Sequence, residues 1–425
     1  MTAVKSSFKA KALQLLLFPQ WLIIAMVLLC TLAAAQKVML GDINNYLIFK
    51  TSFEHLLAGK DLYLLHPEDH FDYYKYSPLF ALLMAPFSLL PVALGASLWG
   101  ALNAALPLWA LHRLGNDYDI ETKKRSLLML VLFLELLTSV QNMQSNGILL
   151  GMMIWGGFEI GLTREKQAAS PGFISGTGIL VLAAFIKPFA AAMGVIAILS
   201  RRLGGAVITG IIFFVGLFLL PLVILPWESL LTQYASWLNL LRWDNQESSG
   251  ISFIGLMKTA FGFELNNTVV QAIAALILVI PFIYLLFVLQ KETQQGKDNE
   301  KSENTLVEKN GEWLREFQLL SIASVLVWVV IFNHKAESPT FVIALAGIYL
   351  YALWSKMGVH DSLKKILIWG TFIMSTLSST DLFPEPLRVF WKENNLKVVP
   401  CLIGWVFIEW ARYKTLLKLT SEANT

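Results

Sequence analysis

Residues 16–42 read LLFPQWLIIAMVLLCTLAAAQKVMLGD, an apolar run followed at once by Gly41 and Asp42. A helix needs about 20 apolar residues to cross a bilayer, and the run is long enough. It therefore predicts a membrane-spanning helix that leaves Asp42 at the membrane–water boundary. Lys5, Lys9 and Lys11 precede the run, and Ala33-Ala34-Ala35-Gln36 resembles a signal-peptidase site. The run exceeds the 7–15 residues typical of the apolar core of a signal peptide, so we expect a retained first helix, with cleavage as the alternative.

The composition excludes several classes of protein. The chain has 425 residues, of which 56% are apolar and 15% charged, whereas soluble domains carry about 25% charged residues. An ordinary soluble enzyme is therefore excluded. The net charge of +3 gives no indication of nucleic-acid binding. Both cysteines lie in apolar runs, which excludes a disulfide-stapled secreted fold.

Long apolar runs like the one at 16–42 recur along the whole chain. Their lengths predict an all-α polytopic membrane protein, a bundle of about 12 transmembrane helices. The candidate helices cover residues 16–38, 92–113, 126–140, 147–163, 172–186, 188–200, 205–226, 266–290, 316–332, 339–354, 363–378 and 397–411. With both termini in the cytoplasm, about two thirds of the 33 lysines and arginines fall on the cytoplasmic side, as the positive-inside rule requires.

One stretch divides the bundle. Residues 291–315 are highly charged and of low complexity, which predicts a solvated cytoplasmic linker. The predicted organisation is an N-terminal membrane region at 1–290, this linker, and a C-terminal membrane region at 316–425.

The predicted extracytoplasmic loops collect the acids, aromatics and amides. The first loop, 41–91, is the longest, and apolar spacing over 44–57 predicts an amphipathic helix on the membrane surface. Residues 79–90, bracketed by prolines, predict an interfacial or re-entrant segment. Such a one-sided collection is what an extracytoplasmic active site requires, whereas transporters place polar groups near the bilayer midplane. A twelve-helix secondary transporter of a small solute is the alternative.

The order of these pieces resembles glycosyltransferase family 87, the polyprenol-phosphate-dependent membrane glycosyltransferases of the GT-C superfamily. The resemblance rests on Asp42 after the first helix, on Tyr46, and on four further segments. These are 56–63 (LLAGKDLY), 76–91 (YSPLFALLMAPFSLLP), 142–150 and 184–188 (AFIKP). It covers roughly the first half of the chain, and residues 333–339 match the family's late outer loop only loosely.

The resemblance implies a GT-C-like helical bundle in the cell (inner) membrane with an outward-facing site. Its donor is a hexose on a polyprenyl phosphate, its acceptor a lipid or glycan hydroxyl, and transfer inverts the anomeric centre. Asp42 is the counterpart of the family's proposed base. Transfer to a hydroxyl needs such a base to take the acceptor proton. From the sequence alone, a helix-capping acid is the favoured interpretation of Asp42; with the resemblance, the base is favoured.

Stabilising the departing phosphate is a second requirement. Lys187 interrupts an apolar stretch, where a charge is costly without a partner, and a lipid phosphate is a suitable one. A snorkelling lysine is the alternative. His334 and Arg242 are further candidates for phosphate binding; alternatively, His334 belongs to a plain polar hairpin and Arg242 pairs with Asp244 or Glu247.

Substrate contacts are expected from residues on the same loops: Asn45, Tyr46, Tyr76, Asn142, Asn146 and Glu337. No metal site is predicted, because the histidines lack HxxxH and HExxH spacing. His66, Glu68, Asp69 and His70 are interpreted as an exposed polar turn. No nucleotide-binding motif is found, so we expect no cofactor and no nucleic-acid partner, only the lipid-linked sugar and its acceptor.

Overall fold

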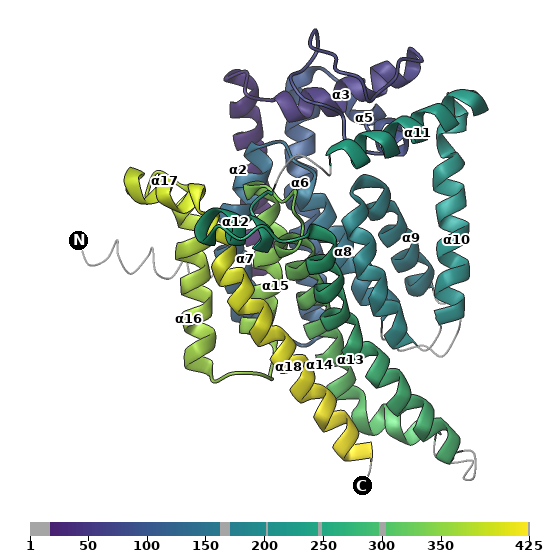
Figure 1. Cartoon of the computed structure of the whole chain (residues 1–425), viewed down its shortest axis with the longest axis vertical. Helices are drawn as coiled ribbons and strands as arrows, with labels where there is room; N and C mark the ends of the chain where they lie inside the picture. Colours follow the sequence, from purple (N-terminus) through teal and green to yellow (C-terminus); the bar gives the residue numbers. More distant parts are fainter. Residues whose placement is uncertain (1–17, 162–170, 201–202, 245–248, 297–302, 424–425) are drawn as a thin grey trace. The chain divides into compact units, whose positions relative to one another are not determined.

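The computed structural model describes residues 18–161, 171–200, 203–244, 249–296 and 303–423. Within these ranges the chain is helical and contains no β-strand (Figure 1). Lys5, Lys9 and Lys11, Glu247 and part of the predicted linker lie outside the described residues.

Helical segments occupy the described part of every stretch predicted from apolar runs. They are α2 (Pro19–Met39), α6 (Val92–Asp117), α7 (Thr122–Gln141), α8 (Asn146–Ile160), α9 (Pro171–Ile186), η1 (Pro188–Ser200), α10 (Leu203–Leu219), η2 (Leu220–Val223), α13 (Asn267–Gly296), α14 (Glu303–Ile331), η3 (Ser338–Thr340), α15 (Phe341–Trp354), α16 (Asp361–Thr371), η4 (Phe372–Thr376) and α18 (Val399–Ala423). In the described part of the chain, five helices are long and apolar enough to span a membrane: Pro19–Met39, Val92–Asp117, Leu203–Val223, Asn267–Phe287 and Gly311–Ile331. The chain is therefore an all-helical membrane protein, and the count of twelve spans stays a prediction.

The chain divides into two compact units. Unit 1 comprises residues 1–155, 178–191 and 209–248, and unit 2 comprises 156–177, 192–208 and 249–425. Of the predicted linker 291–315, residues 291–296 continue α13 and residues 303–315 begin α14.

In unit 1, a layer of short helices lies across one end of the long ones. These are α3 (Asn44–Leu57), α4 (Pro78–Leu83), α5 (Ala85–Ser88) and α11 (Trp227–Asp244). Figure 1 shows α3, α5 and α11 together at the upper ends of α2 and α6. The long helices themselves pack closely: a Cβ on Gly100 of α6 would lie 2.6 Å from the Cβ of Ala34 of α2.

Helix α3 forms over the residues predicted to be helical and ends at Leu57; Gly59 follows the cap with a φ of +67°, which favours glycine. Tyr46, Phe49, Phe53 and Leu56 are buried, and so is the polar Ser52. The helix therefore packs within unit 1 on more than one face. Its position on a membrane surface stays a prediction. Residues 79–90 form no long helix; they fall within the short helices α4 and α5 and the turns beside them.

Unit 2 is built around α13, α14, α15 and α18 and contains a buried ion pair. The side chain of Arg412 is 0% exposed and donates to Glu409 Oε1 and Oε2 at 2.9 and 2.7 Å. Its guanidinium lies 4.9 Å from the ring centre of Phe282 and 5.3 Å from that of Phe317. Glu409 also accepts a hydrogen bond from Ser324. The pair thus joins α13, α14 and α18.

Candidate active site

The best-defined polar site of unit 1 surrounds Lys187, between α9 and η1. Its Nζ donates to Asn146 Oδ1 at 2.8 Å and lies 3.5 Å from Gln144 Oε1. The same Nζ lies 5.7 Å from the ring centre of Tyr76. The structure therefore brings together three residues predicted from separate segments: Tyr76, Asn146 and Lys187.

Helix α6 fixes the turn that carries Asn146. Trp99 Nε1 donates to Met143 O at 3.0 Å, and Asn103 Oδ1 accepts from Ile148 N at 3.2 Å. A Cβ on Gly147 would lie 2.1 Å from Asn103 O, so only glycine allows α8 to begin this close to α6. The start of α8 is thus held rigidly beside Lys187.

Two donors at this turn are buried and have no hydrogen-bond partner among the described residues. They are Asn146 Nδ2 and Ser145 Oγ, and both residues are 0% exposed. Buried polar groups normally find partners, so an unsatisfied donor indicates a missing ligand or water. An ammonium, an amide, a hydroxyl and a helix N-terminus together suit an anionic oxygen.

Asp42 follows α2 in the tight turn at Gly41, whose φ is +71°. The Asp42 side chain is 69% exposed, and its Oδ2 accepts a hydrogen bond from Lys37 Nζ, in the last turn of α2. Because this pair engages Oδ2, the second oxygen can still accept a proton from a hydroxyl. Asp42 therefore lies at the end of the first helix, as predicted.

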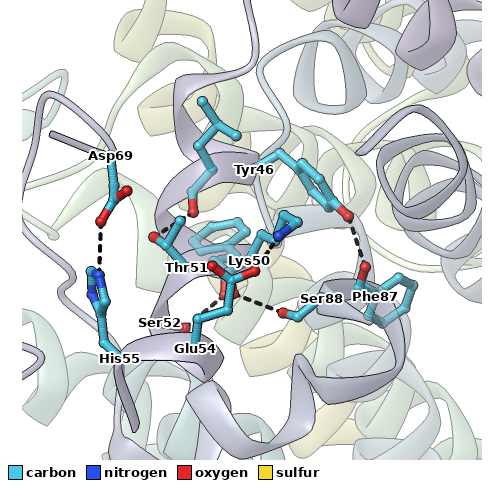
Figure 2. Close-up of polar contacts among 11 residues, drawn as sticks. Tyr46, Lys50, Thr51, Ser52, Glu54, His55, Asp69, Phe87 and Ser88 are labelled. Carbon is cyan, nitrogen blue, oxygen red and sulfur yellow. Dashed lines mark hydrogen bonds and ion pairs between the residues drawn. The ribbon is translucent and has the colours of Figure 1, made fainter. Parts of the chain in front are cut away.

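Helix α3 connects the Asp42 turn to the α8 turn. Asn45 Nδ2 donates to Asn142 O at 2.8 Å, and the Asn142 side chain in turn donates to Thr138 O at 2.8 Å. Tyr46 is fully buried, and its hydroxyl donates to Phe87 O at 3.2 Å (Figure 2). Burial raises the pKa of Tyr46 to about 12. In this position Tyr46 fixes α3; a contact with substrate stays a prediction.

The loop between α3 and α4 is anchored to α11. Gln233 Nε2 donates to Lys60 O at 2.7 Å, Ser236 Oγ donates to Asp61 Oδ2 at 2.9 Å, and Trp237 Nε1 donates to Lys75 O at 3.2 Å. Within the loop, Tyr63 donates its hydroxyl to Tyr76 O at 2.9 Å. The loop thus positions the Tyr76 ring beside Lys187.

Arg242 is exposed near the end of α11. Asp244, one of its two expected partners, forms an ion pair with Lys75 at 3.4 Å.

His334 and Glu337 belong to unit 2. His334 is 7% exposed, and its Nδ1 accepts from Gln271 Nε2 at 3.3 Å, which leaves the proton of the neutral ring on Nε2. Glu337 is exposed at the start of η3. Among the described residues, no three His, Cys, Asp or Glu side chains are arranged to hold a metal ion.

Sequence reasoning missed Lys37, Gln144 and Ser145 as members of the site. Lys37 could have been found, because a lysine in the last turn of a span often pairs with an acid just beyond it. Gln144 and Ser145 carry no such signal: their role depends on the fold of the turn.

The model of glycosyltransferase family 87 matches residues 74–308, more than half of the chain. The chain belongs to glycosyltransferase family 87. This family 87 protein is therefore a membrane glycosyltransferase. The matched range contains Tyr76, Asn142, Asn146, Lys187 and Arg242, whereas Asp42 precedes it and His334 follows it. No curated protein shows significant sequence similarity to the chain.

Proposed function

We propose that this glycosyltransferase moves a hexose from a polyprenyl phosphate to a lipid or glycan hydroxyl on the extracytoplasmic side of the cell membrane. The observation that carries the proposal is the Lys187 site, where buried donors without partners surround an ammonium at a helix N-terminus. Such a site suits a phosphate that loses its sugar, and a lipid phosphate reaches a membrane protein from the bilayer itself.

Lys187, Asn146 and Ser145 hold the donor phosphate in this proposal. The ammonium and the first N–H groups of α8 stabilise the charge that grows on the phosphate as it leaves. Because the donors are already fixed by α6, little reorganisation accompanies the reaction. Arg242 is proposed to contact the same phosphate, and His334, in unit 2, stays a predicted phosphate-binding residue.

Asp42 is the proposed general base. The acceptor oxygen attacks the anomeric carbon while Asp42 takes its proton, and the bond from that carbon to the phosphate oxygen breaks. The products are the glycoside with inverted configuration and the free polyprenyl phosphate. Lys37 orients the Asp42 carboxylate through Oδ2. A single displacement of this kind needs only one carboxylate as base.

The sugar is expected to contact Asn45 and Asn142, which join α3 to the α8 turn. Tyr46 and Tyr76 of unit 1 and Glu337 of unit 2 are the other predicted substrate contacts. The proposal employs no metal and no cofactor besides the lipid-linked donor.

A donor assay tests the proposal. Membranes containing the protein receive radiolabelled polyprenyl-phosphate hexose, or the matching nucleotide sugar, with lipid extract as acceptor. We expect transfer from the lipid donor alone. Asp42→Asn should reduce the rate about 10²–10⁴-fold, whereas Asp117→Asn, which alters an exposed acid paired with Arg113 at 3.9 Å, should not. Transfer from the nucleotide sugar alone, or equal rates for Asp42→Asn and wild type, would contradict the proposal.

A further inference from the structure

Three histidines of the first outer loop form a buried cluster, which we call the histidine cluster: His55, His66 and His70. The ring centres of His55 and His66 lie 4.0 Å apart, and His70 lies 6.4 and 6.2 Å from them. None of the three residues is more than 8% exposed. The prediction of an exposed polar turn at 66–70 was wrong for both of its histidines, because the turn folds back against the end of α3.

One contact of the cluster joins the loop to α3, and the contacts of His66 lie within the loop. His55 Nε2 lies 2.9 Å from Asp69 Oδ2, a contact visible in Figure 2. His66 Nε2 lies 3.0 Å from Asp61 O, and His66 Nδ1 lies 3.4 Å from Glu68 Oε1. His70 Nδ1 is buried and has no hydrogen-bond partner among the described residues.

The charged surroundings are mixed. Asp69 favours protonation of His55 and His70, whereas Lys60 opposes protonation of His55. The main chain of Asp72 contacts His70. Helix α11 reaches the same loop through the neutral side chains of Gln233 and Ser236. The carboxylates can balance one positive ring, but a second would lie a few ångströms from the first in a buried setting.

Burial lowers the pKa of both His55 and His70 below the usual value near 6.5. The closed loop therefore binds fewer protons than the open loop between pH 6.5 and those lowered values. Its stability is complete above pH 6.5 and falls as the pH drops through this window.

We propose that the histidine cluster is a pH-sensitive switch that holds the 59–72 loop closed on α3 at neutral pH and releases it in acid. The loop carries Tyr63, whose hydroxyl holds the main chain of Tyr76. Tyr76 in turn lies beside Lys187. Opening therefore loosens the donor site, and the KM for the donor rises in acid. On the proposed extracytoplasmic side the loop experiences the external pH directly; this exposure and the change in KM rest on the proposed function, whereas the switch itself does not.

Hydrogen exchange of the purified wild-type protein tests the switch. Amide protection of residues 59–72 is compared at pH 7.5 and 5.5, with exchange times scaled for the intrinsic rate. Net uptake of one proton below pH 6.5 predicts about tenfold more opening at pH 5.5. α14, which holds no member of the cluster, provides the internal reference. Equal scaled protection of the loop at both pH values overturns the proposal, and this outcome needs only the wild-type protein.

The double variant His55→Gln/His70→Gln removes the two rings whose pKa burial lowers but keeps polar side chains. Its loop opening should no longer depend on pH, whereas His112→Gln, on α6, should behave as wild type. A double variant with the wild-type pH response overturns the proposal. In the transfer assay, the donor KM should rise about tenfold at pH 5.5 for wild type alone. Failure of transfer at both pH values contradicts the proposed function and leaves the exchange result standing.

Discussion

Lys187 illustrates how a single residue can have two interpretations that only its surroundings separate. A snorkelling lysine directs its amine to the headgroups, whereas Lys187 Nζ donates to Asn146 and lies beside the Tyr76 ring. Both contacts are polar or aromatic groups of unit 1 rather than solvent. The geometry therefore favours a binding role for Lys187.

Replacing Lys187 by Met should raise the KM for the lipid donor about tenfold to a hundredfold, because a charge-assisted hydrogen bond contributes about 1.5–3 kcal/mol. Lys187→Arg should restore part of the affinity. Steady-state kinetics with varied donor concentration measure the effect. The control is Lys258→Met, which alters a lysine with a side chain 56% exposed. A fall in kcat with an unchanged KM would place Lys187 in another role.

At the scale of elements, the contact of α8 with α6 controls the geometry of the site. Gly147→Ala places a methyl group on Asn103 O, which cannot yield because it is main chain. We expect a loss of about 1–3 kcal/mol in the free energy of unfolding, measured by thermal denaturation in detergent. We also expect slower transfer, because Asn146 moves with the turn.

Gly204 in α10 is the matched control, because a Cβ there meets no atom within 4 Å. Gly204→Ala should leave the stability unchanged or raise it by up to about 1 kcal/mol, since alanine is the better helix former. Equal stability of Gly147→Ala and wild type would show that α8 can shift without cost.

The Arg412–Glu409 pair has the same importance for unit 2. Arg412→Met leaves the Glu409 carboxylate without its partner and should lower the stability by about 3–5 kcal/mol. Arg412→Met/Glu409→Met should recover part of the loss. Arg113→Met removes a half-exposed arginine paired at 3.9 Å and should cost less than about 1 kcal/mol. A double variant as unstable as the single one would assign the loss to packing on Phe282 and Phe317.

For the whole molecule, the predicted topology has a direct test. Both native cysteines are buried at 0% exposure, so introduced cysteines can be labelled selectively. A membrane-impermeant maleimide on intact cells should label Leu64→Cys, at a residue 61% exposed in the loop predicted to be the first outer one. It should label Lys356→Cys, at a side chain 70% exposed, only after permeabilisation. The reverse pattern would place the site in the cytoplasm.

Much of the fold could be predicted because each helix is encoded in its own residues. Apolar runs and helix-ending residues act locally, so α2 and α6 were found near their true bounds, and α3 was predicted over 44–57, where it is observed. Hydropathy is less decisive for the number of membrane crossings, since several apolar helices are too short to span a bilayer unaided.

The sequence by itself determined a helical membrane protein, its family resemblance, and an acid placed directly after the first helix, because those properties depend on neighbouring residues. Only the tertiary structure decided which distant side chains meet. Lys187 with Asn146 and Tyr76, and the three buried imidazoles, are joined by helix packing that no local pattern records. The physical reason is that burial and hydrogen-bond partners belong to a position in space, whereas propensity and hydropathy belong to a position in the chain.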